Sequence, residues 1–250
     1  MTGHGVEAVV LDIEGTTGSL SHVRDVLFPC ARRELPRFFT RYGHEPRVRA
    51  LADEVRARLH RPGLDTDGVI AALVSWSDAD VKAAPLKTVQ GWIWAQEYAA
   101  GRLHGHVYPE VPGVLREWRA AGLRLATYSS GSSAAQLDWF RHTAYGDLSG
   151  LFEARFDLDT AGSKSAPVSY RTIAERLGVR PGRTLFLSDT AAELDAAARA
   201  GWQVLGVRRD DDARGASVGA HPTVPSLRPV RPHRPATTPS SPAVREVFPS

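Results

Sequence analysis

The chain has almost no cysteine and no long apolar run. Cys30 is the single cysteine among 250 residues, so an internal disulfide is impossible, and a small buried thiol in a helix is its expected role. No stretch reaches the roughly 18 apolar residues that cross a bilayer, and the N-terminus lacks the charged-then-apolar layout of a signal peptide. We therefore expect a cytoplasmic protein with no membrane partner.

The chain also has slightly fewer acidic than basic residues, but the excess of basic residues is confined to one region. The pI of about 9.2 is of a kind that nucleic-acid-binding proteins often show. Residues 213–250, however, contain five arginines and one acidic residue, which leaves 26 basic and 27 acidic residues in 1–212. Most of the chain is thus nearly neutral, and we expect no nucleic-acid partner.

The C-terminal region is rich in proline as well as arginine. Eight of the 17 prolines of the chain lie in residues 213–250. A segment of this composition is not expected to form a packed core of its own. We predict that residues 220–250 form a disordered Pro/Arg-rich tail.

Short β-rich runs alternate with helical patterns in much of the remaining chain. The β-rich runs are Val6–Leu11, Leu123–Tyr128, Thr184–Leu187, Gln203–Val207 and, more weakly, Ala154–Leu158. The helical patterns between them are Pro112–Ala121, Ser132–Arg141, Val168–Leu177 and Ala191–Ala200. This alternation with short links predicts an α/β fold whose parallel sheet is covered by helices on both faces.

A long helical segment interrupts this alternation after the first predicted strand. It contains four helical patterns, Val23–Tyr42, Arg47–Leu59, Asp67–Ser77 and Leu86–Leu103. An inserted subdomain explains such a segment better than a very long loop does. We predict an α/β catalytic core from residues 1–18 and 112–210, and an all-helical cap from residues 19–111. The chain has no heptad repeats, and we expect a monomer.

Polar residues follow three of the predicted strands. Asp12 and Glu14 come after the first strand, Ser129 and Ser130 after the second, and Asp189 after the third, while Lys164 lies in a Gly/Ser loop before a helix. Ligands of an open parallel sheet bind at the carboxyl ends of its strands, where all these side chains are expected to converge. A single aspartate at such a position is usually a helix cap or a turn former. The ordered set is more specific than any one member.

These motifs resemble those of a known superfamily. Asp12–Gly15, Leu125–Ser130, Lys164 and Leu187–Asp189 with Glu193 look like the four motifs of the haloacid dehalogenase-like (HAD) hydrolases. Within this superfamily, the chain resembles the enolase-phosphatases, also called acireductone synthases, of methionine salvage. The resemblance to them rests on Asp12–Thr17, Asp25–Pro29, Gln90-Gly91-x-x-Trp94, Gly105–Pro109, Tyr128–Ser132 and Phe186–Asp189.

The resemblance implies a HAD-like Rossmannoid sheet with a helical cap and a bifunctional reaction. The expected substrate is 2,3-diketo-5-methylthiopentyl 1-phosphate, and the expected products are phosphate and 1,2-dihydroxy-3-keto-5-methylthiopentene, the acireductone. A phosphate dianion repels a carboxylate nucleophile, so the reaction needs a divalent cation and a lysine. We expect one Mg²⁺ per chain. The only partner expected is this phosphorylated small molecule.

The same resemblance implies a role for each motif residue. Asp12, Glu14 and Lys164 are the expected catalytic residues, with Asp12 forming an aspartyl-phosphate. Ser129, Ser130 and Lys164 are expected to bind the substrate, and Asp12, Glu14 and Asp189 to hold the metal. Whether Glu14 acts through its carboxylate in acid/base catalysis, through its backbone carbonyl on the metal, or through both stays open.

Several secondary candidates have two interpretations each. Glu193 either orients Lys164 or a metal-bound water, or is a solvent-facing helix residue. The aromatic residues of the helical segment are typical of its core, although an apolar surface there would also suit a methylthio-alkyl tail. The aromatic candidates are Phe28, Phe38, Phe39, Trp92, Trp94 and Tyr98.

Three other functions are alternatives to the enolase-phosphatase reaction. One is a HAD phosphatase for another small phosphomonoester, which only the cap would distinguish. Another is a phospho-acceptor signalling domain, but such a domain has no use for a helical lid of this length. The third is a haloacid dehalogenase, against which the acidic pair Asp189 and Glu14 argues, because dehalogenation needs no metal.

Overall fold

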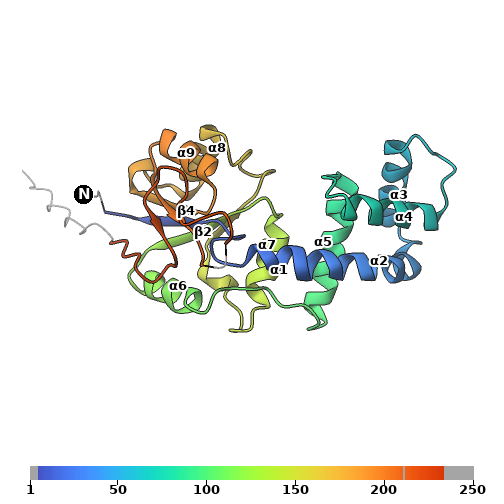
Figure 1. Ribbon diagram of the computed structural model, residues 1–250, viewed down its shortest axis with the longest axis horizontal. Helices are drawn as coiled ribbons and strands as arrows, with labels where there is room; N and C mark the ends of the chain where they lie inside the picture. The colour runs from blue at the N-terminus through green and yellow to red at the C-terminus, as the bar shows by residue number, and fades with distance from the viewer. Residues whose placement is uncertain (1–4, 211, 234–250) are drawn as a thin grey trace, which may run out of the picture.

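A sheet of six parallel strands lies at one end of the molecule (Figure 1). The structure is a computed structural model, which describes residues 5–210 and 212–233. In sheet order the strands are β3 (Ala154–Phe156), β2 (Arg124–Tyr128), β1 (Ala8–Leu11), β4 (Thr184–Ser188), β5 (Gln203–Val207) and β6 (Thr223–Val224). The chain proceeds from β1 to β2 on one side and later returns to β4 on the other. The carboxyl end of β1 is therefore the switch point, where ligands of such sheets bind.

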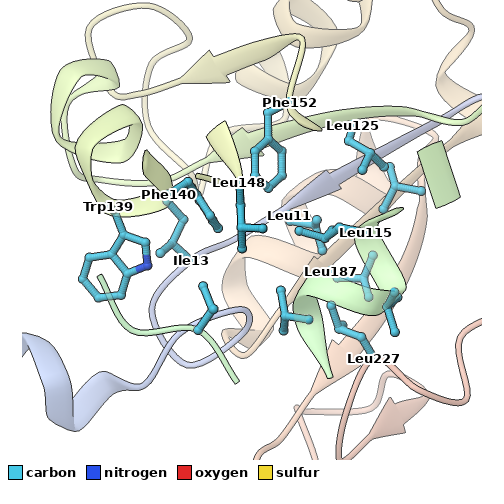
Figure 2. Packing of buried hydrophobic residues seen from close by; sticks show 14 of the residues in the cluster. Leu11, Ile13, Leu115, Leu125, Trp139, Phe140, Leu148, Phe152, Leu187 and Leu227 are labelled. Atoms are coloured by element: carbon cyan, nitrogen blue, oxygen red, sulfur yellow. The ribbon is translucent and has the colours of Figure 1, made fainter. Parts of the chain in front are cut away.

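Helices cover both faces of this sheet, which confirms the predicted α/β class. Alternate residues of β1 face opposite ways, as the pleat of a strand requires. Leu11 packs in one cluster with Leu115 and Phe140 (Figure 2), whereas Val10 packs in the other with Tyr170. The first face carries α6 (Val111–Ala120) and α7 (Ser133–Arg141), and the second carries α8 (Pro167–Leu177) and α9 (Ala191–Arg199).

A helical region with its own hydrophobic core lies between β1 and α6 in the chain (Figure 1). Leu35, Leu51, Leu73 and Ile93 are members of this core, each from a different helix. The helices are α1 (Leu20–His22), a π-helical turn (Val23–Leu27), α2 (Phe28–Tyr42), α3 (Pro46–Arg58), α4 (Thr66–Asp78) and α5 (Ala84–Ala99). Within the described residues, no helix is both long and apolar enough to cross a membrane.

The π-helical turn at the start of the helical region has a local cause. Pro29 has no N–H, and a proline ring crowds the carbonyl four residues before it. The chain responds with a wider turn, in which the Phe28 N–H donates to the Val23 carbonyl. The indole N–H of Trp94 on α5 donates to the Leu27 carbonyl at 2.8 Å and so ties the turn to the rest of the helical region.

The prediction of disorder from residue 220 is wrong for residues 220–233. Strand β6 pairs with β5, and Leu227 and Val230 are buried in the cluster beside the sheet. The Val6 N–H donates to the carbonyl of His233 at 2.8 Å. Apolar residues placed between the prolines cannot form a core alone, but they complete one that the sheet already supplies. The rest of the predicted tail, residues 234–250, lies outside the described residues.

Candidate active site

The loop after β1 forms a tight turn around one carbonyl group. The Ile13 carbonyl accepts the N–H groups of Thr16, Thr17 and Gly18 at 3.2, 3.0 and 2.8 Å. The Gly15 N–H donates to the Gly18 carbonyl at 2.7 Å, which closes the turn. Asp12 lies at its base and is only 4% exposed. The loop thus holds Asp12 rigidly at the carboxyl end of the central strand.

Glycine is required at position 15 for two reasons. Its φ of +80° lies in the left-handed region, which side chains rarely adopt. A Cβ at this position would also lie 2.1 Å from Oδ2 of Asp189. The Asp189 carboxylate, which follows β4, therefore packs directly against the backbone of Gly15 in the loop that follows β1. The motifs that contain Asp12 and Asp189 thus belong to one site.

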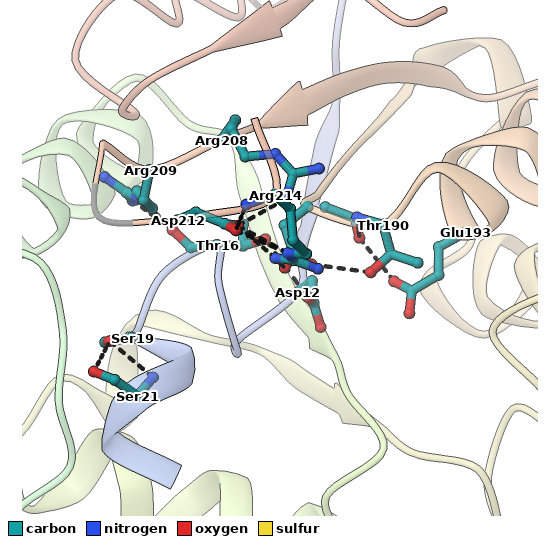
Figure 3. A network of polar contacts seen from close by, with 12 residues as sticks. Asp12, Thr16, Ser19, Ser21, Thr190, Glu193, Arg208, Arg209, Asp212 and Arg214 are labelled. Atoms are coloured by element: carbon teal, nitrogen blue, oxygen red, sulfur yellow. Dashed lines mark hydrogen bonds and ion pairs between the residues drawn. The ribbon is translucent and has the colours of Figure 1, made fainter. Parts of the chain in front are cut away.

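Lys164 connects two carboxylates from different elements. Its Nζ lies 2.6 Å from Oδ1 of Asp12 and 2.8 Å from Oε2 of Glu193 on α9. Glu193 also accepts a hydrogen bond from the Ser188 hydroxyl at 2.8 Å. Glu193 thus orients Lys164, and the alternative of a solvent-facing glutamate is wrong. We call Asp12, Lys164, Asp189 and Glu193 the polar cluster; Figure 3 shows Asp12 and Glu193 within the wider network of polar contacts.

Burial and charge both shift proton affinities at this site. Burial by itself lowers the pKa of Lys164, but the carboxylates of Asp12 and Glu193 outweigh it and raise the pKa above its usual range. Burial raises the pKa of Asp12, against the opposing effect of Lys164. Burial likewise raises the pKa of Glu14. Lys164 is therefore a permanently charged group, and Glu14 holds a proton more readily than an exposed glutamate does.

The buried pair Asp12 and Asp189 matches the donors that Mg²⁺ usually takes from a protein. Within the described residues, no three His, Cys, Asp or Glu side chains form a cluster that encloses a metal. Mg²⁺ typically uses one or two carboxylates and fills its other positions with water and substrate phosphate. Asp189 is only 3% exposed, and its Oδ2 contacts the guanidinium of Arg214, so a positive group already neutralises it. The donor set fits an open magnesium site.

The serines after β2 lie at the same edge of the sheet but differ from each other in exposure. Ser129 is 3% exposed, and its hydroxyl accepts the Gly131 N–H at 3.1 Å. Ser130 is exposed, and its carbonyl accepts a hydrogen bond from Lys87 of α5 at 3.0 Å. The Ser129 hydroxyl proton is free to donate to a ligand. Lys87 links the helical region to the loop that carries both serines.

A cavity of about 560 Å³ lies between the α/β core and the helical region. Glu14, Ser129 and Ser130 line it from the core, together with Ile13 and Trp139. The lining from the helical region includes Leu27, Phe28, Leu86, Gln90 and Trp94, which we call the helical wall. Glu14 thus lines a space that is large enough for a small ligand.

The aromatic candidates divide between the cavity and the helical core. Phe28, Trp94 and Tyr98 line the cavity. Trp92 instead stacks on Phe38 with ring centroids 6.2 Å apart, within the core of the helical region. The interpretation as core is thus confirmed for Phe38 and Trp92, and recognition of a methylthio-alkyl tail stays a prediction for the rings that line the cavity.

Two arginines near the polar cluster were not predicted. The Arg209 guanidinium donates to the Thr16 carbonyl, pairs with Glu110 and lies 3.9 Å from the Tyr108 ring centroid. Arg214 pairs with both Asp189 and Asp212. Their signal in the sequence was the run of charges at residues 208–214, which follows the strand Gln203–Val207. The run indicates polar groups at another strand end, but not which loop they would reach.

Comparisons with known proteins identify the family of the chain. A family model described as haloacid dehalogenase-like hydrolase matches residues 6–201. A Frankia alni protein named enolase-phosphatase E1 is 47% identical over 88% of this chain and 93% of its own length. A protein of the same name from Nocardia farcinica is 50% identical over 81% of this chain and 87% of its own.

Solved structures agree with the fold. The UTR4 protein of Saccharomyces cerevisiae superposes with a TM-score of 0.76 at 27% identity, over 90% of this chain and 100% of that one. CbbY of Rhodobacter sphaeroides, solved with phosphate, gives a TM-score of 0.56 at 18% identity, over 89% of this chain and 95% of that one. The second likeness concerns the fold alone.

Proposed function

Because the chain belongs to the enolase-phosphatase family of the haloacid dehalogenase-like hydrolases, we propose that it acts in methionine salvage. It enolises 2,3-diketo-5-methylthiopentyl 1-phosphate and then removes the phosphate, which gives 1,2-dihydroxy-3-keto-5-methylthiopentene. The observation that carries this proposal is a largely apolar cavity lined by Glu14, Ser129 and Ser130, with the charges of the polar cluster acting on Glu14. The cluster suits the phosphate, and the apolar wall suits the methylthio-alkyl tail.

In the dephosphorylation step, Asp12 is the nucleophile. Its carboxylate attacks phosphorus and forms an aspartyl-phosphate, which water then hydrolyses. Lys164, held between Asp12 and Glu193, cancels part of the charge on the phosphoryl oxygens. The Ser129 hydroxyl donates to the same oxygens, and the loop of Ser130 closes over them.

One Mg²⁺ per chain completes the site. Asp12, Asp189 and the backbone carbonyl of Glu14 hold it, and when bound it supplies the positive charge that a phosphate dianion needs near a carboxylate nucleophile. Asp12 and Asp189 are both buried, and each already contacts a cationic side chain, Lys164 and Arg214 respectively, so the site attracts positive charge.

The Glu14 carboxylate is the proton donor and acceptor in both half-reactions. In the enolisation it takes a proton from C1 and returns it to the adjacent ketone oxygen. In the dephosphorylation it is first protonated again from solvent, gives that proton to the leaving oxygen and then takes one from the hydrolytic water. Its place on the cavity lining and its raised pKa support this role. The longer side chain of a glutamate at this position brings the carboxylate toward the carbon skeleton of the substrate.

Residues 19–111 act as a cap over the core formed by residues 1–18 and 112–210. The separate hydrophobic core of the helical region supports this division. The cavity lies between the two parts, so the cap excludes water from the reaction.

The test compares substrates. Purified protein with Mg²⁺ is assayed for enol formation by absorbance and for phosphate release, with the diketo phosphate and with a panel of sugar phosphates. We expect turnover of the diketo phosphate and little of the panel. Hydrolysis of the panel without turnover of the diketo phosphate would instead identify a phosphatase for another small phosphomonoester. Activity that survives EDTA would contradict the magnesium site.

A further inference from the structure

Gln90 differs chemically from its neighbours on the helical wall. Leu27, Phe28, Leu86 and Trp94 present apolar groups to the cavity, and the indole N–H of Trp94 is already bonded to the Leu27 carbonyl. Gln90 brings a carboxamide to the same surface while being only 7% exposed. A carboxamide on an otherwise apolar wall that makes no bond to the described protein requires an explanation.

The structure provides a direct comparison with a second buried glutamine of the same cavity. Gln136 accepts the Thr127 hydroxyl at 2.5 Å and donates to the carbonyls of Gly131 and Phe156 at 2.9 and 2.7 Å. Within the described residues, the Gln90 side chain makes no such bond. Gln136 therefore holds protein segments together, whereas the Gln90 amide has donors and an acceptor left for a ligand.

Four other polar side chains of the lining are paired or have their unpaired atom fully buried. Lys82 pairs with Asp80, and Lys87 donates to the Ser130 carbonyl. Tyr98 and Trp139 each have a polar atom without a partner, but those two atoms are wholly buried behind the cavity surface. The Gln90 amide retains contact with the cavity itself.

We propose that the Gln90 carboxamide binds the two adjacent ketone oxygens of the diketo phosphate and so selects this substrate. The inference rests on the proposed function and deepens it. Along α5, one turn separates Lys87 from Gln90, and another separates Gln90 from Trp94. All three line the cavity, so the wall presents a cation near the serine loop, then an amide, then an apolar ring. The substrate has the same order: phosphate, ketones, methylthio tail.

The enol is a better partner for a carboxamide than the diketone is. In enolisation the C1 proton passes to Glu14, the C–H electron pair forms the carbon–carbon double bond, and the adjacent ketone oxygen takes the charge and then a proton returned by Glu14. The product presents a hydroxyl donor beside a ketone acceptor. The Gln90 carboxamide presents an acceptor beside a donor, and so stabilises the product and the transition state before it more than the diketone.

The test uses Gln90→Met, which keeps the size of the side chain and removes both polar groups. We expect kcat/KM for the diketo phosphate to fall about 10- to 100-fold. Hydrolysis of p-nitrophenyl phosphate, which has no ketone, should change less than about twofold. The Tm should stay the same or rise, because an unpaired buried amide has been removed.

Gln136→Met is the matched control. It removes the partner of the Thr127 hydroxyl and of the Gly131 carbonyl, and one of the two donors to the Phe156 carbonyl, so it should lower the Tm and both activities together. If Gln90→Met behaves like this control, or if it leaves diketo phosphate turnover unchanged, the proposed subsite is refuted. Wild-type protein that hydrolyses p-nitrophenyl phosphate but never the diketo phosphate would refute the proposed function as well, and is recognised without any variant.

Discussion

The polar cluster and the helical wall have opposite chemistry, and Glu14 connects them, because it lines the same cavity as the wall and lies within reach of the charges of the cluster. In the cluster, Lys164 meets Asp12 and Glu193, and Arg214 meets Asp189, so each charge has a partner of opposite sign. On the wall, apolar side chains surround one carboxamide, that of Gln90, which has no hydrogen-bond partner among the described residues. The difference indicates a division of labour, in which the core performs phosphoryl transfer and the helical region recognises the carbon skeleton. The predictions below test this division.

The largest effect is expected for Asp12→Asn. Loss of the nucleophile should lower phosphate release by about a thousandfold or more. If the helical wall recognises the carbon skeleton independently, the variant should still bind the diketo phosphate, which calorimetry measures. Circular dichroism checks the fold. Retained phosphate release would contradict the assignment of Asp12.

Lys164→Met should have the next largest effect. It removes the cation between Asp12 and Glu193, leaves two carboxylates facing each other, and should lower kcat by about 100- to 1,000-fold. Because the phosphate is common to all substrates, the diketo phosphate and p-nitrophenyl phosphate should be affected alike. Steady-state kinetics with both esters measures this. A loss confined to the diketo phosphate would contradict the division.

Arg209→Met tests what supports the loop of Asp12. The Arg209 and Glu110 side chains are 4% and 9% exposed, and removal of one partner of a buried pair costs about 3 kcal/mol in free energy of unfolding. Arg32→Met is the control, since both side chains of its pair with Asp78 are 53% exposed and the pair should contribute much less. Urea denaturation measures both. Equal losses would contradict the argument.

The same pair predicts a pH dependence. Burial by itself raises the pKa of Glu110, but the hydrogen bond and charge of Arg209 outweigh it, and the pKa in the folded state is lowered. A lowered folded pKa gives stability that is present above the unfolded pKa of about 4.3 and is lost as the pH falls through the folded pKa. The difference in unfolding free energy between wild type and Arg209→Met should therefore shrink below about pH 4.

The smallest effect is expected for Arg214→Gln. The Arg214 side chain is 45% exposed and contacts Asp189, so its positive charge competes with a cation there. Its removal should lower the Mg²⁺ concentration that gives half of the maximal rise in Tm, by about two- to fivefold. Thermal unfolding across a magnesium series measures this without reference to activity. A higher requirement for magnesium would show that Arg214 supports the metal site.

Periodic patterns in the sequence predicted most of the elements, because each pattern is local. The segment Gln203–Val207 is a strand as predicted, and the strand–helix alternation gave the correct sheet with helices on both faces. Composition failed for residues 220–233, where proline and arginine suggested disorder. Val224, Leu227 and Val230 have too few apolar neighbours in the sequence to form a core, and only the sheet provides one.

The four motifs could also be recognised from the sequence, because each motif is a short local pattern. The contacts between the motifs could not be predicted in this way. Asp12, Ser129 and Asp189 each end a strand, and parallel strands bring such residues to one edge. Nothing in the sequence stated that Arg209 would reach the Thr16 carbonyl, 193 residues away. Long side chains reach any loop that the fold places nearby, so spacing does not predict their partners.

The sequence by itself determined the reaction chemistry, because carboxylates, a lysine and serines at strand ends restrict what a parallel sheet can do. Only the tertiary structure decided where the carbon skeleton would be recognised. Nothing in the sequence distinguishes the roles of Gln90 and Gln136, and both are buried beside one cavity. Folding surrounds Gln136 with partners and leaves Gln90 without one, since hydrogen-bond satisfaction depends on neighbours in space.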